Sequence, residues 1–214
     1  MSGHFITFEG IDGCGKTTQR RLTAAWLREQ GHDVLETFEP GDTALGAEIR
    51  GLLLNGEHVP APETELLLFL ADRTQHVREL IQPALERGAI VLCDRYTDST
   101  RAYQLAGRSL DASVLENSLE AMLQVAELGA KPGMTLWFDL PVEEACGRMR
   151  GRVATGEVAT RLDEEKQSFH ERVREGFCAI HAAQPERVRR VNASADVETV
   201  QQQIRQLLTE LMGK

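Results

Sequence analysis

The strongest constraint on the fold of this chain is a glycine-rich loop directly behind an apolar run. The run HFITFE occupies residues 4–9 and is followed by Gly10-x-x-x-x-Gly15-Lys16-Thr17. A strand, a glycine-rich loop and a helix in this order are the context in which such spacing makes a P-loop. Glycines let backbone N–H groups face phosphate oxygens, and the positive end of the helix adds to the attraction. The motif therefore predicts an α/β sheet that binds a nucleoside triphosphate.

Single residues of the loop have expected tasks. Lys16 brings a positive charge to the β- and γ-phosphates, and the Thr17 hydroxyl can bind Mg²⁺. A dinucleotide-binding fingerprint fits less well, because no glycine stands three residues after Gly13-Cys14-Gly15. The P-loop residues expected to bind the nucleotide, which is ATP if the protein is a kinase, are Gly10, Ile11, Asp12, Gly13, Cys14, Gly15, Lys16, Thr17 and Thr18. A P-loop alone could equally belong to a GTPase switch, a motor or another ATPase.

Cys14 adds a hypothesis of its own. A helix N-terminus and a neighbouring lysine lower thiol pKa values, so Cys14 beside Lys16 could be open to slow oxidation or alkylation. The simpler interpretation is a small residue that fills a small space.

The rest of the chain alternates between strand-like and helix-like segments. Further strand-like runs lie at 33–39, 89–94, 134–140 and 187–192. Several are almost continuously apolar, as expected for parallel strands buried on both faces. This alternation predicts a three-layer α/β fold with a mainly parallel sheet, formed as a single domain over residues 1–214.

Two residues predict how helical segments end or bend. Gly31 follows the helical segment behind the P-loop and is expected to cap its C-terminus. Pro83 lies within the long helical segment 62–88, so a kink or a break is expected there.

Charge and composition limit the possible partners. The 214 residues carry a formal net charge of −9, which argues against broad attraction to nucleic acid or to a membrane. The longest apolar run, residues 66–71, is far too short to span a bilayer, and no signal peptide is recognisable, so a cytoplasmic protein is expected. An acidic protein that binds phosphates must gather its positive charge locally.

A second informative segment is LCDRYTDSTRAYQ at residues 92–104. Asp94 and Arg95 follow an apolar strand, and the carboxyl ends of strands are where α/β sheets bind ligands. A carboxylate there can organise Mg²⁺ through water, and an arginine can clamp a phosphate with two parallel hydrogen bonds. Thr100 and Gln104 are four residues apart and would share one helix face.

Phe69 and Arg73 form another pair with helical spacing. The ring can stack on a base, and the guanidinium, which only donates, can bind a carbonyl oxygen. Thymine and uracil carry such an oxygen at position 4, where cytosine has an amino group. The alternatives are a plain core position for Phe69 and a solvated face for Arg73.

Together these segments resemble bacterial thymidylate kinases, P-loop nucleoside monophosphate kinases that transfer the γ-phosphoryl group of ATP to dTMP for dTTP synthesis. The similarity runs essentially end to end and includes FEGIDGCGKTTQ, EPGDT, EIRGLLL, FLADRTQH, LCDRYTDSTRAYQ and RLDEEKQSFHERVREGF. The resemblance implies five parallel strands flanked by helices, a mobile arginine-rich lid, ATP with Mg²⁺ and dTMP as ligands, and a homodimer formed through packed helices.

The resemblance also implies roles for single residues. Phe69 would stack on thymine and Arg73 would bind its carbonyl, with Thr100 and Gln104 completing the base edge, while Tyr103 would lie against the sugar. Asp12 would meet the 3′-hydroxyl, and two arginines would hold the acceptor phosphate. The implied dTMP-binding residues are Asp12, Glu39, Arg50, Phe69, Arg73, Arg95, Thr100, Tyr103 and Gln104; the expected metal-binding residues are Thr17 and Asp94; the expected catalytic residues are Lys16, Arg95, Arg161 and Arg152.

The basic cluster RMRGRVATGEVATR supplies the local positive charge and resembles the lid of the family, at about residues 148–162. Phosphoryl transfer needs cations at the moving group, and the P-loop has no basic residue before Lys16. Arg161 is the first candidate, because RLDEE matches the family segment, and Arg152 is the second. The alternative is a solvated basic loop.

Several residues depart from the pattern of the family, among them Leu105, where the family tends to glycine. Phe38 and Asp42 stand where the family usually has arginine and glycine, which changes the charge near the acceptor. A kinase for another pyrimidine nucleotide such as dUMP therefore stays an alternative. A regulatory NTP-binding module, which hydrolyses slowly and signals, is the alternative from another class.

Overall fold

A computed structural model describes residues 3–55, 58–108, 110, 112–156 and 159–213; the side chains of residues 112–117 and 152 lie outside the description. The strands are β1 (His4–Glu9), β2 (Val34–Phe38), β3 (Ile90–Asp94), β4 (Met134–Asp139) and β5 (Val188–Asn192). The α-helices are α1 (Lys16–Glu29), α2 (Ala44–Arg50), α3 (Pro62–His76), α4 (Gln82–Glu86), α5 (Thr97–Thr100), α6 (Ala112–Glu127), α7 (Val142–Ala154), α8 (Gln167–Ala183) and α9 (Val197–Met212). Three π-helical segments, η1 (Gly51–Asn55), η2 (Val77–Ile81) and η3 (Arg101–Gly107), continue α2, α3 and α5.

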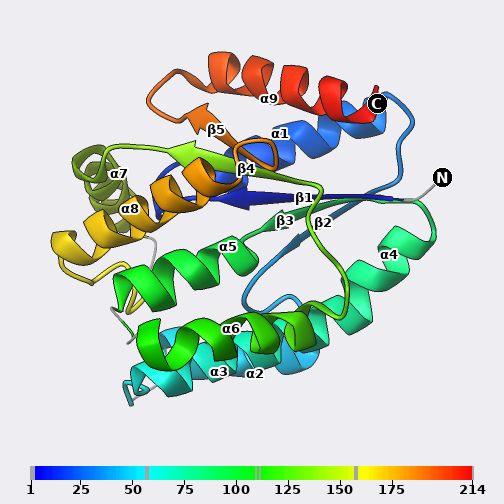
Figure 1. The fold of residues 1–214 in the computed structure, drawn as a ribbon. Coiled ribbons are helices and arrows are strands. Elements are labelled where there is room, and N and C mark those ends of the chain that lie inside the picture. Colours follow the sequence, from blue (N-terminus) through cyan, green and yellow to red (C-terminus); the bar gives the residue numbers. More distant parts are fainter. Residues whose placement is uncertain (1–2, 56–57, 109, 111, 157–158, 214) are drawn as a thin grey trace.

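The five strands form one parallel sheet in the order β2-β3-β1-β4-β5. The central strands β1, β3 and β4 are buried along almost their whole length, which explains their continuous apolar sequences. In Figure 1, α1 and α9 cover one face of the sheet, and α3, α5, α6 and α8 lie on the other. This arrangement confirms the predicted three-layer α/β fold.

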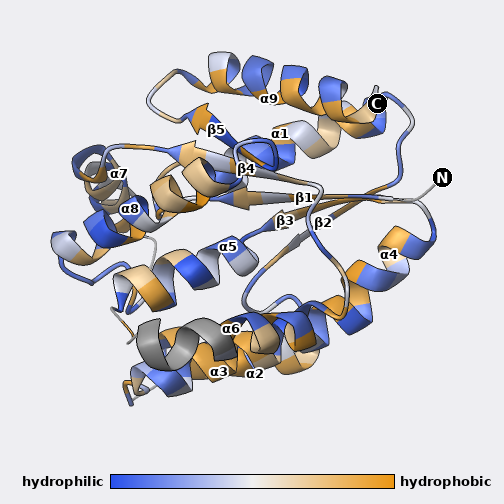
Figure 2. Ribbon diagram, viewed as in Figure 1, coloured by the Kyte–Doolittle hydropathy of each residue, from blue (hydrophilic) through white to orange (hydrophobic). Residues whose placement is uncertain are grey.

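The helices carry both hydrophobic and hydrophilic residues, as Figure 2 shows for α3 and α9. Such helices bury one face against the sheet or a neighbouring helix and leave the other in water. No helix in the described part of the chain is long and apolar enough to cross a bilayer.

The strand register aligns the loops that carry the polar residues. Asp94 at the end of β3 lies opposite Phe8 of β1 and Phe38 of β2. The loops after these three strands therefore leave the same edge of the sheet. The connection that leaves β1 runs toward β2, whereas the connection that leaves its neighbour β4 runs the opposite way toward β5. In open α/β sheets such a switch point is where ligands bind.

The predictions for the cap at Gly31 and for the kink or break at Pro83 have different outcomes. Gly31 follows α1 with φ +86°, a left-handed conformation suited to glycine, and so confirms the predicted cap. Pro83 does not break its helix, because residues 62–86 are helical throughout. The π-helical turn η2 precedes the proline, and the Gln82 N–H donates to the Val77 carbonyl five residues earlier. This wider turn lets the helix continue past a residue that has no N–H to donate.

Candidate active site

The glycine-rich loop between β1 and α1 has the backbone of a phosphate-binding loop. Gly10, Gly13 and Gly15 have φ values of 143°, 82° and 94°, which side chains disfavour. A Cβ atom at Gly10 would lie 2.7 Å from the Phe138 carbonyl oxygen, and one at Gly13 would lie 2.7 Å from that of Ala145. Glycine is therefore required at both positions, and the N-terminus of α1 opens toward the loop.

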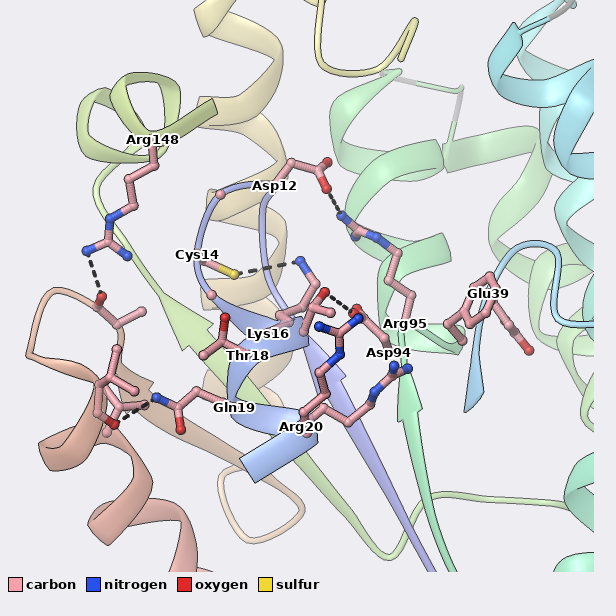
Figure 3. A pocket seen from close by; sticks show the side chains of 18 of the residues that line it. Asp12, Cys14, Lys16, Thr18, Gln19, Arg20, Glu39, Asp94, Arg95 and Arg148 are labelled. Atoms are coloured by element: carbon pink, nitrogen blue, oxygen red, sulfur yellow. Dashed lines mark hydrogen bonds and ion pairs between the residues drawn. The ribbon is translucent and has the colours of Figure 1, made fainter. Parts of the chain in front are cut away.

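Lys16 lies folded over this loop. Its Nζ donates to the carbonyl oxygens of Gly10 at 3.0 Å and Ile11 at 3.2 Å, and it lies 3.7 Å from the Cys14 Sγ. Figure 3 shows the lysine and the cysteine side by side within the loop. The ammonium group is thus held where phosphates bound by the loop would meet it.

The hypothesis of a reactive Cys14 is wrong in its physical premise. The residue is 2% exposed. Burial raises the pKa of the Cys14 thiol above its ordinary value, and this effect outweighs the attraction of Lys16 and Arg95 for a thiolate. Cys14 is therefore a small packing residue.

Thr17 and Asp94 form a pair suited to Mg²⁺. The Thr17 hydroxyl donates to the Asp94 Oδ2 at 3.1 Å beside the loop. Mg²⁺ bound with nucleotides takes one or two protein oxygens and completes its shell with phosphates and water. One hydroxyl and one carboxylate fit this pattern, and no larger cluster of His, Cys, Asp and Glu suited to a metal occurs in the described structure.

A cavity of about 620 Å³ lies in front of the loop. One wall is formed by the P-loop and α1, and Figure 3 shows Arg148 of α7 opposite this wall, beside the chain that carries α9. The Arg148 Nη2 donates to the Ala193 carbonyl at 3.2 Å, and the Gln19 amide donates to the Val197 carbonyl at 2.9 Å. Arg148 belongs to the expected lid segment; the other lining residues outside the P-loop that were not among the expected site residues are Gln19, Arg20, Arg21, Phe38, Ala193, Ala195, Val197 and Val200.

A second cavity of about 290 Å³ adjoins the first. All nine residues expected to bind dTMP line it, so the structure brings them together from five parts of the chain. Four residues line both cavities: Asp12, Glu39, Arg50 and Arg95. Groups bound in the two cavities would therefore meet between the two arginines.

Arg95 is fixed at this junction. Its φ of 70° is unusual for a residue with a side chain. Its Nη2 donates to Asp12 Oδ1 at 2.8 Å and to the Tyr103 hydroxyl at 3.0 Å, while Nη1 donates to the Ser99 hydroxyl at 3.1 Å. Burial alone would raise the pKa of the Asp12 carboxyl, but Arg95 and Lys16 hold it well below its ordinary value. The junction thus contains an ionised Asp12 and a guanidinium locked in one direction.

Glu9 supports the loop that carries Arg95, which the sequence did not indicate. Its carboxyl accepts from the backbone N–H groups of Tyr96 and Ser99 and from the Ser99 hydroxyl. Burial and the nearby Asp98 raise the pKa of Glu9 to about 8. The signal in the sequence was an acidic residue at the end of a mainly apolar strand, directly before the P-loop.

Arg73 is the charged centre of the second cavity and is 1% exposed, so a solvated face is excluded. Its Nε donates to Glu39 Oε2 at 2.8 Å, its Nη2 lies 2.8 Å from the same oxygen as an ion pair, and Nη1 donates to the Thr100 hydroxyl at 2.8 Å. Phe69 is partly buried and lines the cavity beside it. The cavity thus combines an aromatic ring with a fixed donor.

Phe38 and Asp42, which differ from the usual residues of the family, each contact a neighbouring side chain. The Arg50 guanidinium lies over the Phe38 ring, 5.8 Å from its centroid, so an aromatic face supports the arginine. Asp42 accepts a hydrogen bond from the Thr37 hydroxyl, which also contacts His76. Asp42 lines neither cavity.

The lid arginines lie apart from one another. Arg161 lines neither cavity, although its neighbours Thr160 and Leu162 line the second one. Its Nη2 donates to Glu65 and its Nε donates to the Leu53 carbonyl at 3.2 Å. The Arg152 side chain and residues 157–158 lie outside the described structure. Among the described residues of the basic cluster, Arg148 is the arginine that lines the P-loop cavity.

The P-loop lies at the switch point of a parallel sheet, and its cavity adjoins a second polar and aromatic cavity at two arginines. These features define a P-loop phosphotransferase with separate donor and acceptor sites. The comparisons with known proteins name the family. The family model for thymidylate kinase matches residues 8–204, and the chain belongs to the thymidylate kinase family.

Individual relatives match over nearly full length. The chain is 50% identical to a thymidylate kinase of Thermomicrobium roseum over 98% of this chain and 96% of the relative. It is 44% identical to that of Nostoc punctiforme over 97% and 96% of the two chains. The crystal structure of thymidylate kinase from Ehrlichia chaffeensis superposes with a TM-score of 0.75 at 32% identity, covering 98% of this chain and 100% of that one.

Proposed function

We propose that this protein transfers the γ-phosphoryl group of ATP to dTMP and so produces dTDP and ADP for dTTP synthesis. The observation that carries the proposal is the junction of the two cavities at Asp12, Glu39, Arg50 and Arg95. ATP would occupy the P-loop cavity and dTMP the second one. Their phosphates would then meet between two cations, as an in-line transfer requires.

The catalytic work is positioning and neutralisation. An oxygen of the dTMP phosphate attacks the γ-phosphorus while the bond to the β-phosphate oxygen breaks, and ADP leaves. Lys16 neutralises the donor phosphates, and Arg50 and Arg95 hold the acceptor phosphate against them. Thr17 and Asp94 would hold Mg²⁺, which when bound neutralises charge on the β- and γ-phosphates.

The second cavity supports a pyrimidine with a carbonyl at position 4. Arg73 only donates, so it matches the O4 acceptor of thymine and opposes the amino group of cytosine. Phe69 would stack on the base, with Thr100 and Gln104 at its edge. Tyr103 and Asp12 would contact the sugar.

We assign a lid function to residues 148–162, with Arg161 as the first catalytic candidate and Arg152 as the second. Thr160, Leu162 and Asp163 already line the acceptor cavity, so a shift of this segment would move Arg161 with them. Such a shift must first break the contact of Arg161 with Glu65.

The protein is further proposed to be a cytoplasmic homodimer that binds neither nucleic acid nor membranes. All four cysteines are free thiols, which suits a reducing compartment. On α3 and α6, apolar side chains line an open hollow; Leu67 and Val125 there are 57% and 67% exposed. A second copy of the chain would cover them.

Measuring ADP release with dTMP, dUMP, dCMP and no acceptor tests this function. Turnover that depends on dTMP is expected, with dCMP the poorest acceptor. A preference for dUMP would make the protein a uridylate-type kinase, and ADP release independent of any acceptor would favour the regulatory NTP-binding module.

A further inference from the structure

A buried carboxylate outside both cavities connects the base site to the lid. Glu65 lies in the first turn of α3 and is 1% exposed. It lines neither cavity, and the phosphotransfer described above does not use it. A carboxylate at such depth must be compensated by donors.

Three side chains donate to Glu65. Its Oε1 accepts from the Gln104 amide nitrogen at 3.1 Å and from the Arg108 Nε at 3.1 Å. Its Oε2 accepts from the Arg108 Nη2 at 3.0 Å and from Arg161. Burial raises the pKa of Glu65, but hydrogen bonds from Arg108, Arg161 and Gln104 outweigh it and lower the pKa below its ordinary value. Glu65 is therefore ionised at neutral pH and can only accept.

An acceptor-only neighbour decides which end of the Gln104 amide faces it. The nitrogen of Gln104 must point at Glu65, so its carbonyl oxygen points the other way. Gln104 is 2% exposed and lines the acceptor cavity beside Arg73. The Arg73 guanidinium thus offers a donor to a base in the cavity, and the Gln104 carbonyl offers an acceptor beside it.

This donor–acceptor pair matches the edge of one class of pyrimidine. Thymine and uracil carry an O4 acceptor next to an N3–H donor, whereas cytosine carries an amino donor next to an N3 acceptor. A cytosine base would place donor against donor and acceptor against acceptor.

We propose that Glu65 is a positioning residue that orients the Gln104 amide and thereby makes the site discriminate against cytosine nucleotides. The inference rests on the proposed function, because Gln104 must face the base of the acceptor. Replacing Glu65 by glutamine removes the constraint, since an amide can donate or accept and Gln104 can then turn either end to the base.

The ratio of kcat/KM for dUMP to kcat/KM for dCMP tests this proposal. Both acceptors lack the 5-methyl group, so the ratio reports only the edge of the base. In Glu65→Gln the ratio is expected to fall at least tenfold, while the ratio of dTMP to dUMP stays within twofold. Glu63→Gln, an exposed substitution in the same turn of α3, should leave both ratios unchanged.

The Glu65→Gln substitution also weakens the contact with Arg161 and can therefore slow turnover with every acceptor. A loss of turnover that is equal for dUMP and dCMP cancels in the ratio of their kcat/KM values. A Gln104→Met variant should show the same fall, and adding Glu65→Gln to it should cause no further change. Equal losses for dUMP and dCMP in Glu65→Gln would overturn the proposal and leave Glu65 a structural residue.

If Glu65→Gln does not fold, Glu65→Asp keeps an acceptor for the long arginine side chains but withdraws it from Gln104. The same fall in the ratio is expected, and an unchanged ratio would contradict the proposal. Absence of acceptor-dependent turnover in the wild-type protein would instead defeat the proposed function itself.

Discussion

Asp72 is a buried carboxyl whose pKa lies close to neutral pH. Its Oδ1 accepts from the Gly41 N–H at 3.0 Å, and its buried Oδ2 has no hydrogen-bond partner in the described structure. Burial, and then the charge of Glu39, raise the pKa of Asp72 to about 7. The folded protein therefore holds a proton there over a range in which an unfolded chain has lost it.

Replacing Asp72 by asparagine should remove this dependence on pH. Between about pH 4 and pH 7 the folded state binds one more proton than the unfolded state, so stability falls as pH rises, by up to ~1.4 kcal/mol per unit. The asparagine side chain stays neutral, and the melting temperature of the Asp72→Asn variant relative to wild type should increase from pH 5 to pH 8. Asp33→Asn, on an exposed aspartate, is the control. A difference that is equal at both pH values would contradict the raised pKa.

At the scale of elements, α8 and η3 pack too closely to accept a larger residue. A Cβ atom at Gly176 of α8 would lie 2.9 Å from the Ala106 Cβ and 3.1 Å from the Ala102 Cα. These neighbours are backbone and short side chains, which cannot turn away. The η3 segment carries Tyr103 and Gln104, so the position of the acceptor site depends on this packing.

Gly176→Ala is therefore expected to lower the free energy of unfolding by ~1–3 kcal/mol through overpacking. The matched control is Gly147→Ala on α7, where an added Cβ meets nothing within 4 Å. Alanine there should be neutral or should stabilise by up to ~1 kcal/mol, because glycine is a poor helix residue. Urea denaturation measures both, and equal stabilities of the two variants would refute the argument.

The lid makes its own prediction at this scale. Arg161→Ala should slow phosphoryl transfer in a single turnover at least tenfold, because a cation at the moving group can be worth ~10³-fold or more. Arg148→Ala should mainly raise the KM for ATP, since Arg148 lines the donor cavity. Arg150→Ala, an exposed change on the same helix, is the control. If Arg161→Ala and Arg150→Ala transfer equally fast, the catalytic role of Arg161 fails.

The helices and strands could be predicted where the sequence pattern alone shows which residues are buried. The run predicted as a strand at 134–140 forms β4 over Met134–Asp139, because a continuous apolar run has no solvated face. The wider turn before Pro83 was not predictable, since π-helical turns depend on tertiary packing. The resemblance to the family predicted that the acceptor residues lie together. The contacts of Glu65 were not predictable, because they also depend on tertiary packing.

The whole molecule separates its charges. The formal net charge is −9, yet the described wall of the P-loop cavity includes Lys16 and five arginines: Arg20, Arg21, Arg50, Arg95 and Arg148. Anionic nucleotides are thus attracted to one place on a protein that repels polyanions elsewhere. The requirement for a local positive cluster followed from composition, but its members came from α1, α2 and the loop after β3 as well as from the lid.

The exposed apolar side chains on α3 and α6 predict where two copies of the chain would meet in the proposed homodimer. Leu67 and Val125 expose more than half of their area over an open hollow of about 350 Å³. Charged side chains placed there in two copies would repel each other and lose apolar contact, so Leu67→Glu combined with Val125→Glu should convert a dimer into a monomer. Light scattering after size exclusion measures the mass, and Leu22→Glu on α1, across the sheet and 39% exposed, is the control. Both cavities are built from one chain, so the monomer should still bind dTMP. A wild-type monomer, or a dimer that survives both glutamates, would show that this face is not the interface.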